Sequence, residues 1–388
     1  MLTPLPTKGT PNPFVSSTVA STDSQTSKDS QKIVATNNNV YVNAHDDNHH
    51  LEDLTHHHHN EEDVGYIYKF SVRQMCIDVL NLDWSKVIWN MIICDAILHL
   101  LALGGFYLFI TGQIKGLSYL YFFVFGIMSG LGVTMGVHRL WAHRSYKAVF
   151  AVRLVLMCLH CVAFQHSIFS WSVNHRVHHK WPDTDRDLTN SRRGFFFAHM
   201  GWRMYETHEE LIKGRKMVPV QDLLDDPVVR FQHEYFYWIA IPLSFVLPTI
   251  IPFYFWNEDL LFAFLTCGML RLIITHHVTN CINSVAHLYG YKPYDKTMHA
   301  RDHIVFGPLA LGEGWHNYHH AFPRDYRASE MDGWCFNLTT KIIETLAKFG
   351  LTYDLVTVSD DIINKRAART GNPDERRRGP LVAAAVFS

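Results

Sequence analysis

Four apolar segments, each close to the length needed to cross a bilayer, constrain the fold more than any other feature of this sequence. They are residues 87–111, 118–137, 235–255 and 260–281. A transmembrane helix needs about 20 consecutive apolar residues, and only helices and closed barrels can cross a bilayer. Short connections join the first segment to the second and the third to the fourth. The sequence therefore predicts an all-α membrane protein with four transmembrane helices in two hairpins.

The basic residues predict how these helices are oriented. Region 138–234, between the two hairpins, is rich in Lys and Arg, whereas the outer connections carry only Lys115. Basic residues near membrane spans mark the cytosolic side. We therefore expect both termini and both large polar regions in the cytosol, where the polar regions form a helical cap.

The polarity of the chain predicts three parts. Residues 1–63 are polar and rich in His, with too little apolar surface to fold, so we expect a disordered tail. Residues 64–358 form the membrane domain, and residues 359–388 form a charged tail. The apolar stretch 148–164 is expected to lie in the membrane interface or to cover the site. With 35 Lys plus Arg and 36 Asp plus Glu, nothing favours nucleic-acid binding.

Some spans carry ionisable side chains that are costly in lipid. Asp95 and His99 lie in the first span, and Arg271 lies in the fourth. We expect all three to face the interior of the protein.

Three histidine clusters flank the spans on the predicted cytosolic side. In two of them the spacing i, i+3, i+4 places the imidazoles on one face of a helix. A further element places Asn283 and His287 four residues apart at the end of the fourth span. The ligand candidates are His138, His143, His175, His178, His179, Asn283, His287, His316, His319 and His320.

The number of histidines favours two redox metal ions. Removing hydrogen from an unactivated CH2 group requires an oxidant made from O2 and hence a redox metal, and imidazole suits iron. Nine histidines give two ions four or five nitrogens each, with Asn283 as a weaker ligand acting directly or through water. Two zinc ions would leave no open position for O2. Nearby carboxylates that could orient the imidazoles are Asp183, Asp185, Asp187, Asp302 and Glu313.

Several stretches resemble the membrane acyl-CoA desaturases of the stearoyl-CoA type, especially insect members. The resemblance covers roughly residues 83–353. The matching stretches are HRLWAHRSYK at 138–147, HRVHHK at 175–180, NSRRGFFF at 190–197, DPVVRFQ at 226–232, NSVAHLYG at 283–290 and LGEGWHNYHH at 311–320.

The resemblance implies a four-span helical fold whose cytosolic cap holds two irons on the nine histidines, with Asn283 reaching one iron through water. It implies O2-dependent insertion of a cis double bond, at the Delta-9 position, into a long-chain acyl-CoA held in a bent tunnel. Electrons would come from cytochrome b5 and its NADH-dependent reductase. The His-Pro-Gly-Gly haem signature is absent, so the donor would be a separate protein. The resemblance also implies that this protein lies in the endoplasmic reticulum membrane.

The sequence also departs from that family at substrate contacts. Val173-Asn174 replaces Arg-Asp, Glu206-Thr207 replaces a basic pair, His166 replaces Asn, and Thr279-Asn280 replaces Thr-Trp. Head-group recognition and the position of the double bond therefore stay open. Candidate tunnel residues are Gln165, Trp171, Thr279 and Asn280, and candidates for contacts with phosphates or acidic lipid are Arg192 and Arg193.

Other functions can use similar residues. A membrane fatty-acyl or sphingolipid hydroxylase, or a desaturase of other regioselectivity, would use similar clusters. A catalytically silent regulatory relative is a further alternative. A metal transporter would place its ligands near the middle of the bilayer, whereas these clusters lie outside one face.

Overall fold

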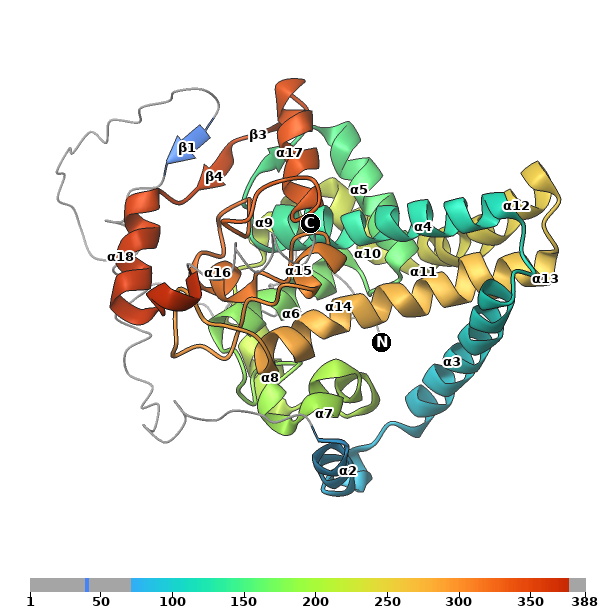
Figure 1. Ribbon diagram of the computed structural model, residues 1–388, viewed down its shortest axis with the longest axis horizontal. Helices are drawn as coiled ribbons and strands as arrows, with labels where there is room; N and C mark the ends of the chain where they lie inside the picture. Colours follow the sequence, from blue (N-terminus) through green and yellow to red (C-terminus); the bar gives the residue numbers. More distant parts are fainter. Residues whose placement is uncertain (1–38, 42–70, 377–388) are drawn as a thin grey trace, which may run out of the picture.

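The computed structural model describes residues 39–41 and 71–376 (Figure 1). Within the tail expected to be disordered, it describes only β1 (Asn39–Tyr41), which pairs in parallel with β4 (Leu355–Thr357). The rest of that tail and residues 377–388 lie outside the described residues. The division of the chain into three parts stays a prediction.

Four long apolar helical stretches confirm the predicted spans. The first is α3, and each of the others joins two or three consecutive helical segments. The spans are Trp89–Ile110, Gly116–Ala142, Phe236–Trp256 and Leu260–Leu288. The segments are α3 (Trp89–Ile110), α4 (Gly116–Leu131), η3 (Gly132–Ala142), α11 (Phe236–Ile241), η6 (Pro242–Val246), α12 (Leu247–Trp256), α13 (Leu260–Ala263), η7 (Phe264–Leu270) and α14 (Arg271–Leu288). Tight connections at one end make two hairpins, and the cap lies at the opposite end of α4 and α14 (Figure 1).

Three of the four spans contain a π-helical segment, namely η3, η6 and η7. The segment η3 begins at Gly132, where a Cβ atom would lie 2.2 Å from the backbone nitrogen of His160 on the neighbouring helix α5. Glycine therefore allows α5 to approach the span at the point where its winding changes.

The cap consists mostly of short helices in the region between the hairpins. They are α5 (Phe150–Ala163), α6 (Ile168–Lys180), η4 (Ser191–Arg193), α7 (Phe195–His199), η5 (Gly201–Met204), α8 (Glu209–Arg215), α9 (Gln221–Asp225) and α10 (Pro227–Glu234). The stretch 148–164 forms α5, which meets α6 at 82°. Phe164 takes a left-handed conformation at this bend, and Ser167 then caps α6 by accepting a hydrogen bond from the Ser170 N–H.

The described C-terminal part packs onto the same cap. Its elements are α15 (Phe306–Leu309), α16 (His316–Ala321), α17 (Leu338–Lys348), β3 (Thr352–Tyr353), β4 and α18 (Asp360–Thr370). β3 pairs antiparallel with β2 (Lys147–Ala148). Ile363 and Ala367 of α18 pack with Tyr294, Tyr318 and Phe322. Two short helices, α2 (Val72–Leu80) and η2 (Trp84–Lys86), precede the first span.

The ionisable residues of the spans face other parts of the protein, as predicted. Asp95 is buried and forms an ion pair with Arg203 at 2.9 Å. Arg271 is 1% exposed, and its guanidinium donates to the carbonyls of Val162 and Ser244. The half-buried His99 lies 3.1 Å from His277 across α3 and α14. These contacts join the spans to one another and to the cap.

Candidate metal centre

The winding of η3 explains how two histidines five residues apart can serve one site. In an ordinary α-helix, residues i and i+5 point in different directions, whereas a π-helix pairs residue i with residue i+5. Here the His143 N–H donates to the His138 carbonyl, 3.1 Å away. Both imidazoles therefore point to the same side at the cap end of the second span.

The other histidines come from three helices. The helix α6 carries His175, His178 and His179, and α16 carries His316, His319 and His320. The last turn of α14 contributes His287. All of these imidazoles meet between the two long spans and the cap.

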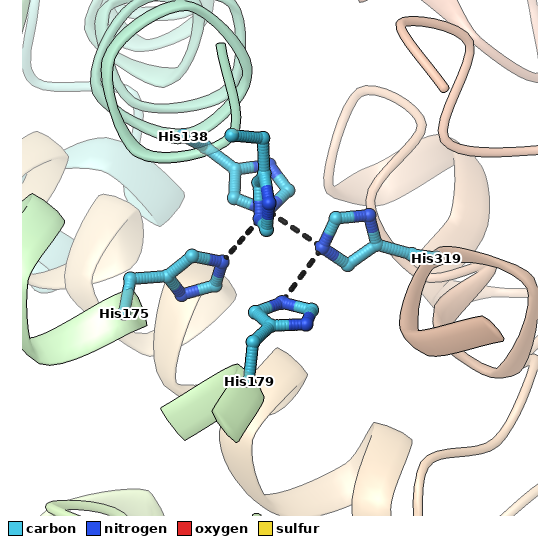
Figure 2. Close-up of side chains that lie close together, drawn as sticks. His138, His175, His179 and His319 are labelled. Atoms are coloured by element: carbon cyan, nitrogen blue, oxygen red, sulfur yellow. Dashed lines mark hydrogen bonds between the residues drawn. The ribbon is translucent and has the colours of Figure 1, made fainter. Parts of the chain in front are cut away.

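Five of the nine histidines form a first group. They are His138, His143, His175, His179 and His319, and one ring nitrogen from each lies within 4.8 Å of the others. The Nε2 atoms of His138 and His319 are 3.0 Å apart, and those of His143 and His175 are 2.8 Å apart. Figure 2 shows the rings of His138, His175, His179 and His319 turned toward a common centre.

The other four histidines, His178, His287, His316 and His320, form a second group under the same 4.8 Å limit. The Nε2 atom of His316 lies 3.0 Å from those of both His287 and His320, and His178 lies 3.2 Å from His320. Asn283 is one helical turn before His287 and lines the cavity beside this group.

Buried carboxylates hold three of the imidazoles by their other nitrogen. The Nδ1 atoms of His178 and His287 lie 2.8 Å from Asp187 and 2.9 Å from Asp183, respectively. The Nδ1 atom of His138 lies 3.0 Å from Glu313, which also pairs with the buried Arg139. A carboxylate at Nδ1 fixes the ring and leaves Nε2 free to bind a metal.

The remaining two carboxylates that we considered have other positions. Asp185 is exposed. Asp302 is buried and accepts hydrogen bonds from the backbone N–H groups of Asn317 and Tyr318, and burial raises its pKa to about 8. Asp302 therefore anchors the start of α16 and does not orient an imidazole.

Burial keeps most of these imidazoles uncharged. Burial, together with neighbouring imidazoles, holds the pKa well below the usual value of 6.5 at six positions outside the spans. These are His143, His175, His179, His316, His319 and His320. At His178 burial also lowers the pKa, but Asp187 and Asp183 outweigh it and raise the pKa. Neutral imidazoles offer lone pairs at neutral pH, as metal binding requires.

Each of the two groups could hold a metal ion. Nε2 atoms 2.8–3.2 Å apart, backed by carboxylates at several Nδ1 atoms, match nitrogen ligands that share an ion. Without an ion between them, the lone pairs on several of these neutral imidazole nitrogens would face and repel one another. A metal ion at the centre of each group removes this repulsion.

A cavity leads from both groups along the membrane spans. Together with the space at its open side it encloses about 1340 Å³, and its walls come mainly from α4 and α14. His138, His175, His178 and His316 line one end, and Phe122 and Arg271 line the cavity farther along the spans. Most of the exposed surface of the walls is apolar, although Asn283, Glu313 and three threonines also line the cavity.

Only some of the predicted tunnel residues line this cavity. Trp171 and Thr279 line the cavity, and the side chain of Gln165 donates a hydrogen bond to Thr279 at 2.9 Å. The residues that line this cavity do not include Asn280, whose carbonyl accepts a hydrogen bond from Ser284.

The two predicted head-group arginines also lie away from the cavity walls. Arg192 is exposed, and the guanidinium of Arg193 stacks on Phe197 at 3.6 Å and on Tyr205 at 4.6 Å. Arg193 lines a small separate cleft together with Glu206 and Asp185.

Sequence reasoning missed a chain of imidazoles on the other side of α14. His277 contacts His99 at 3.1 Å and His199 at 2.9 Å, and His199 contacts Ser284 at 2.9 Å. The three histidines come from α3, α14 and α7, and no sequence spacing links them.

Comparison with known proteins identifies the family. The sequence model described as "Fatty acid desaturase" matches residues 115–329. A Delta(9)-fatty-acid desaturase of Caenorhabditis elegans is 41% identical over 293 residues, which cover 76% of this chain and 86% of the relative. Stearoyl-CoA desaturase 5 of Bos taurus is 45% identical over 289 residues, 74% of this chain and 85% of the relative. An acyl-CoA Delta12-desaturase of Acheta domesticus is 42% identical over 293 residues, 76% of this chain and 80% of the relative.

The chain therefore belongs to the fatty acid desaturase family, a family of oxidoreductases. Its fold is that of a helical membrane protein with four spans, and its histidines form groups that could hold metal ions. The predicted family, fold class and enzyme class are confirmed.

Proposed function

We propose that this protein is a di-iron acyl-CoA desaturase that uses O2 to place a cis double bond in a long acyl chain. The observation that carries the proposal is the position of both histidine groups at one end of an apolar cavity between two membrane spans. This arrangement brings CH2 groups to a metal centre and keeps water away from both.

The two irons would be held by the two histidine groups, with Asn283 near the four-histidine group. When bound, they supply the O2-derived oxidising power that removes two hydrogens from adjacent carbons. The overall reaction takes one O2, two electrons and two protons, and it leaves the alkene and two waters. Zinc has no redox change to offer here.

The residues of this chain position the substrate. A flexible acyl chain has many similar CH2 groups, so only held geometry can select one pair. The indole of Trp171 stacks on His175 at 4.7 Å and forms part of the cavity wall. The hydrogen bond between Gln165 and Thr279 fixes the wall next to it. These contacts define which carbons lie beside the histidines.

We propose acyl-CoA as the substrate and Delta-9 as the position, since relatives carry names with acyl-CoA, stearoyl-CoA and Delta-9. Other relatives are named for Delta-12, so the position needs direct measurement. We further propose cytochrome b5, with its NADH-dependent reductase, as the electron donor. We also propose that this protein lies in the endoplasmic reticulum membrane. Basic residues at the cap end of the spans favour a cytosolic cap and cytosolic termini.

Expression in desaturase-deficient yeast tests the proposal. We expect new monounsaturated fatty acids, with the double bond at carbon 9 when its position is determined by mass spectrometry. The variant His319→Ala is the matched control. A hydroxy acid without an alkene would show a hydroxylase, and iron-loaded protein without any product would show a silent relative.

A further inference from the structure

On each of the two long helices that line the cavity, α4 and α14, some lining residues are buried and others are exposed. On α4 the residues Phe122 and Gly126 are one turn apart and face inward, and Phe122 is buried. Their neighbours Phe123 and Ile127 also line the cavity, yet their side chains are 57% and 43% exposed. Residues one position apart lie about 100° apart around a helix, so the cavity wall extends from the interior onto the outer face of α4.

The helix α14 repeats this arrangement. Arg271 and Thr275 line the cavity and are buried, whereas Ile274, one position before Thr275, lines it and is 44% exposed. Val278, one turn further along, also lines the cavity and is half-buried. Both helices therefore present a buried stripe and an exposed stripe to the same space.

The exposed stripes belong to membrane spans. Phe123 and Ile127 lie in the second span, and Ile274 and Val278 lie in the fourth. An exposed side chain at these depths faces the acyl chains of the bilayer. On α4, Gly126 and Gly130 also line the cavity. A Cβ atom at Gly126 would lie 3.8 Å from Cγ of Arg271 on α14, so the glycine lets the two helices lie close together at the cavity wall.

We infer that the cavity opens sideways into the bilayer through a slot between α4 and α14, and that acyl chains pass through it between cavity and membrane. The slot is bordered by Phe123, Ile127, Ile274 and Val278. This inference rests on the proposed function, because it assigns a route to the substrate or product of that site.

The chemistry of a long acyl chain favours such a route. A chain drawn end-on out of a closed tunnel must expose its CH2 groups to water, whereas a chain moving sideways stays in apolar surroundings throughout. The border of the slot is wholly apolar. The ligand is thus a single aliphatic chain, whose polar end stays at the membrane surface.

Photolabelling of the full-length protein in phosphatidylcholine vesicles tests the slot. The probe is palmitic acid with a diazirine near its methyl end, and the readout is the rate at which Phe122 and Thr275 become labelled, measured by mass spectrometry. Two variants change the slot: Ile127→Trp with Ile274→Trp narrows it, and Ile127→Ala with Ile274→Ala widens it. The matched control is Leu120→Trp with Leu103→Trp, at positions 62% and 61% exposed on α4 and α3 that do not line the cavity.

We expect several-fold slower labelling in the narrowed variant, faster labelling in the widened variant and an unchanged rate in the control. Equal rates in all variants would overturn the inference. So would a decrease in both slot variants, because distortion of the fold, not passage, would then explain the loss. Labelling needs neither O2 nor a reductant, so a protein that makes no alkene can still show the slot.

Discussion

The contact between Asp183 and His287 offers a sharp test of how the metal centre is held. Asp183 is 2% exposed, and one of its carboxylate oxygens lies 2.9 Å from the Nδ1 atom of His287. The other oxygen accepts a hydrogen bond from the backbone N–H of Ser191 at 3.0 Å. Burial by itself raises the pKa of Asp183, but His287 and these hydrogen bonds outweigh it and hold the pKa below its usual value. Asp183 is therefore a buried carboxylate anion.

The substitution Asp183→Asn removes the charge and little else. Asn has the same shape, tolerates the left-handed backbone found at position 183, and can still accept from Ser191. Its amide lacks the negative charge that the His287 N–H faces. A hydrogen bond to a charged group is worth about 1.5–3 kcal/mol, and loss of such a metal-orienting partner lowers metal affinity about 10- to 100-fold.

Asp183→Asn should weaken metal binding at the four-histidine group only. His287 belongs to the four-histidine group, whereas the five-histidine group is held by other residues. We expect the purified Asp183→Asn protein to lose about half its iron to a graded series of chelator concentrations before the wild type loses any. The assay is elemental analysis after dialysis, with thermal unfolding followed by circular dichroism.

Asp185→Asn is the matched control, because it removes the same charge two residues away at an exposed position. Its iron retention should equal that of the wild type. If Asp183→Asn also keeps both metals at every chelator concentration, the carboxylate does not support His287 as a ligand, and our reasoning fails.

Three more predictions follow from the geometry. His319→Ala should abolish the unsaturated product and leave helix content unchanged, because His319 contacts both His138 and His179; product at the wild-type level would remove His319 from the ligand set. Gly126→Phe should shift the products toward shorter acyl chains, because a Cβ atom at this position would lie 3.8 Å from Cγ of Arg271 and the new ring would enter the cavity there; an unchanged chain-length profile by gas chromatography would contradict this. The metal-free protein should lose stability as the pH falls below about 6.5, because the unfolded histidines take up protons there and the folded ones, with lowered pKa, do not. A thermal midpoint that stays constant between about pH 7.5 and 5.5 would refute this assignment.

The spans and the ligand types were predictable because their signals are local. An apolar run of sufficient length predicts a span by itself, and the i, i+3, i+4 spacing predicts one face of a helix. The pairing of His138 with His143 was not predictable in this way. It depends on the π-helical winding of η3, which begins where Gly132 lies close to α5 and leaves no periodicity in the sequence.

The carboxylates show where local reasoning ends. Asp183, Asp185 and Asp187 look equivalent in the sequence. In the fold, Asp183 takes a left-handed conformation, and the turn that follows directs Asp183 and Asp187 inward and Asp185 outward. The direction of each side chain depends on backbone geometry that residue types alone do not reveal.

The histidine triplets of α6 and α16 explain why a desaturase site would use three imidazoles per helix. At about 100° per residue, positions i+3 and i+4 lie on opposite sides of position i, so a triplet spreads across a wide arc. On α6, His175 and His179 join the five-histidine group and His178 joins the other.

On α16 the assignment is reversed, since His316 and His320 join the four-histidine group and His319 joins the first. Each helix thus gives its i, i+4 pair to one group and its i+3 imidazole to the other, and the two helices complement each other. Because each helix contributes imidazoles to both groups, the geometry of the helix fixes the distance between the two groups. The spacing that made the clusters visible in the sequence is therefore also what couples the two histidine groups.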